Sequence, residues 1–296
     1  MKKFFKTTFA ILIGVSLTVV GCKKSSTTDP VDPNNPNNPN NPTVPSSFTQ
    51  KVMLEEYTGA WCGWCVDGHY NVKQIAEVNP NLVPILIHQG DAMETSDFAS
   101  YFNPTFKVTG FPMAAVQRIK NAAGLFVMNR PWNTPVANAS MAKASLGLSI
   151  DATLLEDPSA VTPKVKIAFA EDVKVPLYVG VYLVEDSVSG TGSTYDQKNF
   201  LSGRAGYESS PFYSKPAVLI GYKHNHVLRR ALYPSPQGVL LDSALTKKGK
   251  VIEFSRMFSY NGCIKENCSM IAFVHTPGGK VYNVQTVKVG KAKAWD

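Results

Sequence analysis

The chain has 296 residues, 44% of them hydrophobic, and a formal net charge of +8. Loss of Lys2, Lys3 and Lys6 with a predicted signal leaves +5 (8 − 3), and no long basic block remains, so the composition gives no reason to expect nucleic-acid binding. The sequence also lacks a phosphate-binding loop and a Gly-x-Ser-x-Gly elbow, so hydrolase and nucleotide-binding functions have no support.

The N-terminus has the pattern of a secretory signal peptide, predicted at residues 1–21. A basic start precedes an apolar stretch, residues 9–20, that is too short to span a bilayer comfortably. The stretch ends in Thr18-Val19-Val20-Gly21-Cys22, which resembles the lipobox of bacterial lipoproteins. The resemblance implies that Cys22 becomes a lipidated N-terminus. The membrane is therefore a predicted partner through this lipid, and Cys22 is neither a metal ligand nor a disulfide partner.

Residues 22–47 are predicted to be the lipid anchor and a disordered stalk. The segment holds three Asn-Asn-Pro units and almost no apolar side chains, so it cannot bury enough surface to offset the entropy of ordering. If wholly extended at about 3.1 Å per residue, the 25 residues from Lys23 to Ser47 would reach up to roughly 75 Å. We therefore look for function from Phe48 onward.

Residues 48–145 alternate between strand and helix patterns, which predicts a small α/β domain. Strands are expected at residues 51–57, 82–87, 113–119 and 125–128, and helices at residues 66–79, 97–106 and 135–144.

The most informative motif, Cys62-Gly63-Trp64-Cys65, lies between the first strand and the first helix of this domain. Two cysteines with this spacing can close into a disulfide, and the free N–H groups of a helix N-terminus favour the thiolate of Cys62. The pattern is typical of redox chemistry. A structural disulfide in an oxidising compartment is an open alternative, and so is a zinc site shared with Cys263 and Cys268. Since an oxidised pair would not bind metal, no metal is predicted.

The motif and its surroundings resemble the thioredoxin superfamily. Trp61-Cys62-Gly63-Trp64-Cys65 is similar to the Trp-Cys-Gly-Pro-Cys of that family, and Gly110-Phe111-Pro112 to its Gly-x-Pro, whose proline is cis and packs beside the disulfide. The resemblance implies a thioredoxin-like α/β fold in which Cys62 is the exposed nucleophile and Cys65 the buried resolving cysteine. A cis Pro112 would leave the backbone of Phe111 free to pair with a substrate strand.

The same resemblance gives roles to nearby residues. Glu56 matches the buried acid that accepts the proton of the resolving thiol, and a carboxyl in a low-dielectric site can exchange protons near neutrality. Glu55 is expected on the opposite face of the strand; an exposed edge position is the alternative for Glu56. Trp64 replaces the proline of the family motif, which leaves the direction of electron flow open. Trp61 and Trp64 either form an apolar lip for a protein substrate or cover the domain core.

From residue 146 the apolar pattern changes to period two, which predicts an all-β, sandwich-like domain over residues 146–296. Cys263 and Cys268 are expected to form a structural disulfide across a short loop. His224 and His226 share one face of an extended segment, but no third ligand is identifiable, so we predict no metal and no cofactor. The strands are expected at residues 147–154, 164–169, 177–184, 227–232, 251–258, 270–274 and 281–289.

Taken whole, the chain resembles the 28-kilodalton outer-membrane protein family of Gram-negative anaerobes. The lipobox carries this resemblance together with Leu54-Glu55-Glu56-Tyr57-Thr58-Gly59 and Asn225-His226-Val227-Leu228-Arg229. It implies an outer-membrane lipoprotein that faces the periplasm or the cell surface.

The sequence therefore predicts a thiol–disulfide exchange protein that acts on protein thiols or disulfides. The alternative is an adhesin or receptor-like protein that binds a surface ligand and has a structural disulfide. The predicted catalytic residues are Cys62, Cys65 and Glu56, and the predicted substrate contacts are Trp61, Trp64, Phe111 and Pro112.

Overall fold

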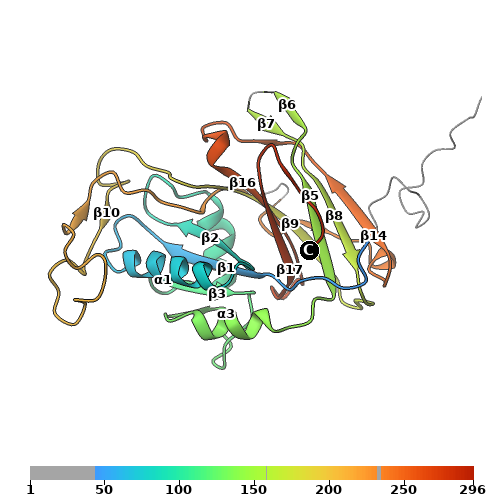
Figure 1. Cartoon of the computed structure of the whole chain (residues 1–296), viewed down its shortest axis with the longest axis horizontal. Helices are drawn as coiled ribbons and strands as arrows, with labels where there is room; N and C mark the ends of the chain where they lie inside the picture. Colours follow the sequence, from blue (N-terminus) through green and yellow to red (C-terminus); the bar gives the residue numbers. More distant parts are fainter. Residues whose placement is uncertain (1–43, 158, 232–234) are drawn as a thin grey trace, which may run out of the picture. The chain divides into compact units, whose positions relative to one another are not determined.

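The computed structural model describes residues 44–157, 159–231 and 235–296, which belong to one compact unit (Figure 1). The predicted signal peptide, Cys22 and the predicted stalk up to residue 43 lie outside the described residues. Within the described part of the chain, no helix is both long and apolar enough to cross a membrane.

A mixed sheet dominates the fold, and among the described residues it has nine strands. They are β1 (Val52–Thr58), β2 (Leu82–His88), β3 (Met113–Val116), β4 (Val127–Met128), β9 (Tyr178–Glu185), β12 (Val227–Ala231), β13 (Val239–Leu240), β16 (Cys268–His275) and β17 (Val281–Lys288). The order across the sheet is β17, β16, β9, β12, β2, β1, β3, β4, and β13 also pairs with β9.

The sheet crosses the predicted domain boundary between residues 145 and 146. On one side, β1 and β2 are parallel, and β3 and β4 follow antiparallel. On the other side, β12 pairs with β2 through Val227 and Leu86 and continues antiparallel into β9. The division into residues 48–145 and 146–296 stays a prediction, but strands of both parts share one sheet.

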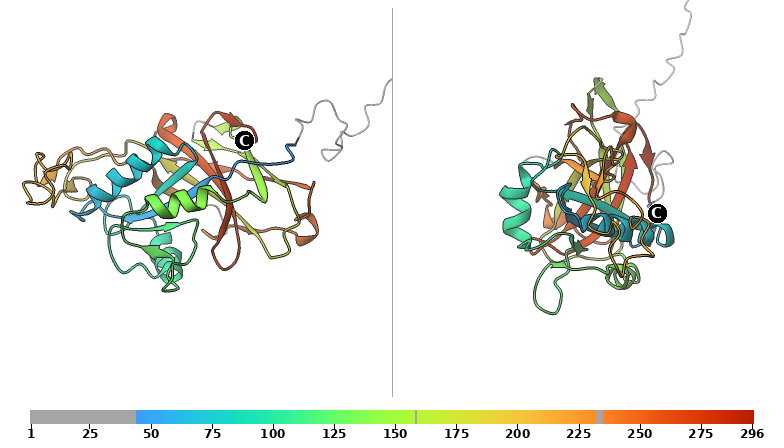
Figure 2. Two further views of the ribbon diagram at one scale, coloured as in Figure 1. Left: turned by 60° about the horizontal axis from the view of Figure 1, so that its bottom comes forward. Right: turned by 90° about the vertical axis from the view of Figure 1, so that its left-hand side faces the viewer.

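Helices cover both faces of the sheet near β1 (Figures 1 and 2). Among the described residues, the helical segments are α1 (Cys65–Val78), α2 (Asn103–Phe106), α3 (Asn133–Ser140), the π-helix η1 (Phe98–Phe102), and the 3-10 helices η2 (Ser243–Leu245) and η3 (Lys265–Asn267). Successive side chains of a strand point to opposite faces, so Val52 and Leu54 pack with α1 and α3, whereas Met53 and Tyr57 pack with η1 and α2.

Smaller sheets complete the C-terminal half. Residues of β5 (Leu146–Asp151) and β8 (Lys164–Phe169), such as Leu148 and Ile167, form one hydrophobic core with residues of β9 and β16, such as Val181 and Ala272. The chain is thus mostly β-sheet with few helices. Across the described residues, the smaller sheets are β14 (Val251–Ser255), β8 (Lys164–Phe169), β5 (Leu146–Asp151) and β18 (Ala292–Lys293); β15 (Phe258–Ser259), β7 (Ala160–Val161) and β6 (Leu155–Asp157); and β10 (Gln197–Lys198) with β11 (Val218–Leu219).

The long connection between β9 and β12 leaves the main sheet and reaches the turn between β1 and α1 (Figure 1). We call residues 186–226 the β9–β12 connection; it contains β10 and β11, which pair antiparallel. Lys198 N donates a hydrogen bond to Ala60 O at 2.8 Å, and Phe200 N donates to Gly63 O at 2.9 Å. The C-terminal half of the chain therefore builds one wall around the Cys62–Cys65 turn.

Candidate functional site

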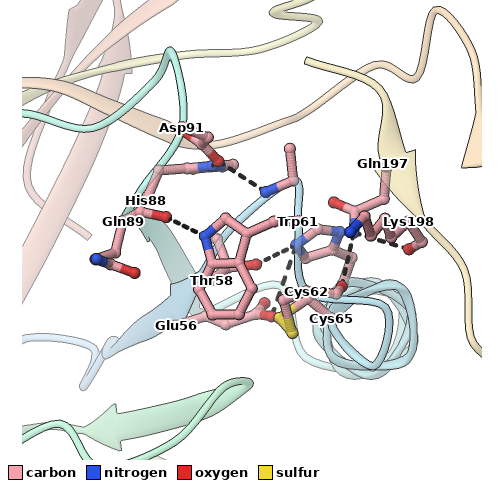
Figure 3. The surroundings of a disulfide bond; sticks show 12 residues. Glu56, Thr58, Trp61, Cys62, Cys65, His88, Gln89, Asp91, Gln197 and Lys198 are labelled. Carbon is pink, nitrogen blue, oxygen red and sulfur yellow. Dashed lines mark hydrogen bonds and ion pairs between the residues drawn. A yellow bond between two sulfur atoms is a disulfide. The ribbon is translucent and has the colours of Figure 1, made fainter. Parts of the chain in front are cut away.

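Cys62 and Cys65 are joined in a disulfide at the start of α1, with their Cα atoms 5.4 Å apart (Figure 3). A tight turn positions them: Cys62 N donates to Gly59 O at 3.0 Å and Cys65 N to Cys62 O at 3.1 Å. Cys65 is completely buried and Cys62 is 5% exposed. Since α1 begins at Cys65, the pair lies at the positive end of the helix dipole.

The low exposure of Cys62 corrects the expectation that it is an exposed nucleophile. The β9–β12 connection packs against its turn, where Gln197 Nε2 donates to Cys62 O at 2.9 Å. The Phe200 ring lies so close to Gly63 that a Cβ on Gly63 would clash with it. These contacts come from residues far along the chain, which the local motif does not reveal.

The two tryptophans of the motif have different surroundings. Trp61 is 38% exposed, donates from Nε1 to Gln89 O at 2.6 Å, and packs edge-on against Phe111 with ring centroids 5.3 Å apart. Trp64 is half-buried and packs against Phe200 and other residues of the β9–β12 connection. Trp61 thus lies at the rim of the site, whereas Trp64 holds the connection in place.

Glu56 and Pro112 meet α1 at Gly68, three residues after Cys65. A Cβ on Gly68 would clash with Glu56 Oε1 and would come within 2.8 Å of Pro112 Cβ, so a larger residue would force one of these neighbours to move. The Phe111–Pro112 peptide bond is cis, as the thioredoxin resemblance implied. Figure 3 shows the Glu56 side chain pointing toward the disulfide. The structure therefore brings Glu56, Pro112 and the cysteine pair together.

Glu56 is completely buried, and neither carboxyl oxygen has a hydrogen-bond partner among the described residues. Burial raises the pKa of Glu56 well above its usual value, and the charge of Arg130 only partly opposes this shift. Glu55, the preceding residue, forms a two-point ion pair with Arg118 at 2.7 Å for both bonds. A carboxyl whose pKa is raised by burial binds its proton at higher pH than an exposed carboxyl does, which suits it to proton exchange with a thiol.

Three histidine rings, those of His69, His88 and His224, pack together near Glu56. From the sequence, His69 lies four residues after Cys65 on the same helical face, where either modulation of the thiols or a partly buried helix position is expected, and His88 carries no signal. His69 Nε2 is 3.7 Å from Glu56 Oε1, and the rings of His88 and His224 are 5.2 Å apart. His88 Nδ1 bonds to Asp91 Oδ2 at 2.7 Å, and the same oxygen accepts from Ala60 N at 2.7 Å. Burial works against ionisation of Asp91, but the His88 bond and the backbone donors leave its pKa below the usual value.

No group of three or more histidine, cysteine or acidic side chains in the described part of the chain is arranged to hold a metal ion. His224 and His226, which share one face in sequence, have separate partners: His224 Nε2 bonds to Tyr195 O at 2.8 Å, and His226 Nδ1 lies 3.2 Å from Asp186 Oδ1.

Cys263 and Cys268 are free thiols, which differs from the expected structural disulfide. The half-buried Cys263 thiol hydrogen-bonds with Cys268 and with Arg229, and these partners lower its pKa to about 7. The bond with Cys263 and burial together raise the pKa of Cys268, whose Sγ donates to Ile264 O at 3.3 Å. The sulfur atoms of Cys263 and Cys268 are therefore hydrogen-bonded and not joined in a disulfide.

Comparisons with known proteins address the family but not the cysteine pair. A solved structure, HBP35 of Porphyromonas gingivalis, is similar with a TM-score of 0.64 and 18% identity, over 83% of this chain and 77% of that one; at this identity the likeness shows the fold alone. No curated protein matches the sequence. The family model "Outer membrane protein Omp28" matches residues 99–293, a range that begins after Cys62 and Cys65. Since this match covers more than half of the chain, the chain belongs to the Omp28 outer membrane protein family.

Proposed function

We propose that this protein is a lipid-anchored thiol–disulfide exchange protein of the outer membrane, with a thioredoxin-like site. The single observation that carries the proposal is that the buried Glu56 and Pro112 meet α1 at Gly68, three residues after the disulfide-bonded Cys65 at the start of that helix. The order β2, β1, β3, β4, with α1 between β1 and β2, supports the thioredoxin-like part.

In the proposed reaction, the reduced protein passes two electrons to a partner disulfide. The Cys62 thiolate attacks one partner sulfur, and the other partner sulfur leaves as a thiolate that takes up a proton. Cys65 then gives its thiol proton to Glu56 and attacks the Cys62 sulfur, which closes the disulfide and releases the second partner sulfur as a thiolate that takes up a proton from water. The reverse sequence oxidises a partner dithiol. Trp61 and Phe111 would contact the partner because they meet at the rim of the site.

A redox titration tests this proposal most directly. The protein is equilibrated with glutathione buffers, and the Cys62–Cys65 state is measured by thiol labelling and mass spectrometry. The midpoint reduction potential of an exchanging pair should lie well above about −300 mV, whereas that of a structural disulfide should lie below about −300 mV. The titration and the trapping experiment that follows use the Cys263→Ser/Cys268→Ser variant, because these substitutions remove the other described thiols.

Cys65→Ala provides the second test, since it should trap mixed disulfides on Cys62. In the same background, Cys62→Ala/Cys65→Ala is the matched control, which cannot trap. Absence of any trapped partner, together with a potential below about −300 mV, would contradict exchange.

The second candidate function is a surface binding protein with a structural disulfide, and the 5% exposure of Cys62 favours it. The two functions differ in what Phe200 does. In an exchanging site, the Phe200 ring would only cover the cysteine pair, and thiol reactivity depends on access. Phe200→Ala should then raise the rate of oxidation of the reduced protein by oxidised glutathione by about tenfold. If the disulfide is structural, Phe200→Ala should leave the pair just as resistant to reduction.

A further inference from the structure

Glu56 has no direct route to water in this structure. It is completely buried, and no hydrogen-bond donor of the described residues reaches its carboxyl oxygens. A proton that Glu56 takes from Cys65 must leave before the next reaction cycle, so a second group has to receive it. His69, four residues after Cys65 in α1, has Nε2 3.7 Å from Glu56 Oε1. A small side-chain movement would bring these atoms to hydrogen-bond distance.

The two ring nitrogens of His69 face different surroundings. Nε2 faces the buried carboxyl and lies 2.8 Å from Thr58 Oγ1. Nδ1 lies 3.3 Å from the hydroxyl of Tyr222, whose ring is stacked on the imidazole with centroids 5.9 Å apart. His69 therefore connects the inside of the site with the β9–β12 connection, to which Tyr222 belongs.

The Tyr222 side of His69 opens to solvent. His69 and Tyr222 line a cavity of about 580 Å³ together with Lys73, whose side chain is 70% exposed. The His69 side chain itself is 8% exposed. A proton that reaches the Nδ1 side of the ring can thus be passed to water in this cavity.

The groups that face His69 favour a neutral ring, as a relay requires. Burial and the neighbouring His224 and His88 hold the pKa of His69 well below its usual value, so a proton from Glu56 stays on the ring only briefly. Glu56 faces the ring from β1, and its charge, after burial, contributes to the raised pKa of Tyr222. The charge of Arg130 acts on Glu56, where it favours the ionised carboxylate.

We propose that His69 and Tyr222 carry the proton of Glu56 between the buried disulfide and the solvent-open cavity. This inference rests on the proposed exchange function and makes both side chains positioning residues for the Cys65 step. Glu56 gives the proton received from Cys65 to His69 Nε2, and His69 gives up the proton on Nδ1 through the Tyr222 hydroxyl to water. One proton leaves for each Cys65 thiol oxidised, and the relay moves no electrons.

Oxidation of the reduced protein by oxidised glutathione separates the two chemical steps. The attack of Cys62 depends on the glutathione concentration, whereas the closing attack of Cys65 sets a limiting rate at high concentration. Stopped-flow fluorescence of the adjacent Trp61 and Trp64 follows both. At about pH 7, His69→Gln should lower the limiting rate about tenfold and Tyr222→Phe about threefold, while the concentration-dependent step changes less than about twofold.

The pH profile distinguishes a proton relay from general damage to the site. The limiting rate of His69→Gln should recover toward the wild-type rate as the pH approaches about 8.5, where a thiol loses its proton without help. The control is His275→Gln, another largely buried histidine, whose ring nitrogens bond to the backbone oxygens of Gln237 and Thr276. It should keep the wild-type profile.

The outcomes separate this inference from the proposed function. A wild-type protein that oxidised glutathione does not oxidise contradicts the exchange function itself. A reactive wild type whose limiting rate and pH profile are unchanged in His69→Gln contradicts the relay alone. If His69→Gln does not fold, Tyr222→Phe decides: an unchanged limiting rate contradicts the relay, and a rate lowered about threefold that recovers at high pH supports it.

Discussion

Glu55 and Glu56 are consecutive residues of β1, and neither side chain is exposed to solvent. Glu55 accepts two hydrogen bonds from Arg118, whose guanidinium also donates to the Tyr182 hydroxyl at 3.0 Å. Glu56 has no described hydrogen-bond partner, and burial raises its pKa. The two carboxyls are thus equally buried but differ in their hydrogen-bond partners. A carboxylate paired with a guanidinium joins strands, whereas burial without a partner raises the pKa of a carboxyl and favours proton exchange.

The surroundings of Arg118 show how completely the Glu55 pair is built into the core. The guanidinium lies 5.0 Å from the centroids of both Phe106 and Phe273. Burial opposes the charge of Arg118, but Glu55 raises its pKa well above the usual value. Since Tyr182 belongs to β9, the pair connects β1 with the C-terminal half of the sheet.

The largest effect is expected when the Glu55 pair is broken. Arg118→Met leaves a buried carboxyl without its partner and should lower the free energy of unfolding by about 3–5 kcal/mol, measured by urea denaturation. Glu55→Gln/Arg118→Met removes both charges and should recover most of this loss. A double variant as unstable as the single one would show that the pairing of charges is not what stabilises this region.

The next largest effect, on the rate of disulfide closure, is expected when the Glu56 carboxyl is replaced. Glu56→Gln keeps the shape but cannot accept a proton, so the limiting rate of disulfide closure by oxidised glutathione should fall about 100-fold, or about 2.7 kcal/mol in barrier. Arg118→Met is the contrasting control, because it should lose stability while the rate per folded molecule stays close to wild type. Equal limiting rates for Glu56→Gln and wild type would remove Glu56 from the reaction.

Much of this comparison could be predicted from β1 alone. Strand alternation predicts that Glu55 and Glu56 face opposite sides, and most of the strands predicted by apolar patterning are present with shifted ends. The partners could not be predicted, because Arg118 lies 63 positions after Glu55, and such contacts depend on tertiary structure.

The β9–β12 connection shows the same limit at the candidate site. Its strands, β10 and β11, are only two residues long, so they leave no periodic pattern. Gln197 nevertheless bonds to Cys62 from 135 positions away, and Phe200 and Tyr222 come from the same segment. The motif predicts the chemistry of the cysteine pair. The residues of the β9–β12 connection that pack over the pair have no sequence pattern that predicts this contact.

A smaller effect is expected from filling the space that keeps Glu56 beside α1. In an exposed helix, Gly→Ala stabilises by roughly 0.5–1 kcal/mol. At Gly68 we expect the opposite sign, a loss of about 1–3 kcal/mol in thermal or urea denaturation, because the new methyl group would clash with Glu56 and Pro112. Gly68→Ala/Glu56→Ala should regain part of the loss. Stabilisation by Gly68→Ala would mean that the carboxyl does not pack against the helix.

The smallest effect is a pH dependence of stability that comes from Glu56. Its pKa is raised in the folded protein above the usual 4.5, so the folded state holds this proton more tightly than the unfolded state. The resulting stability is complete below pH 4.5 and is lost as pH rises toward the folded pKa, by at most about 1.4 kcal/mol per pH unit.

Comparison with Glu56→Gln isolates this contribution, because buried histidines such as His69 and His224, whose pKa values are lowered, act in the opposite direction in both proteins. The difference in unfolding free energy between the two proteins, measured in urea from about pH 4.5 to 8, should therefore move steadily in favour of Glu56→Gln as the pH rises. A difference independent of pH would mean that Glu56 is ionised in the folded protein. Burial would then not raise the pKa of Glu56, and the tuning of this carboxyl for proton exchange would be contradicted.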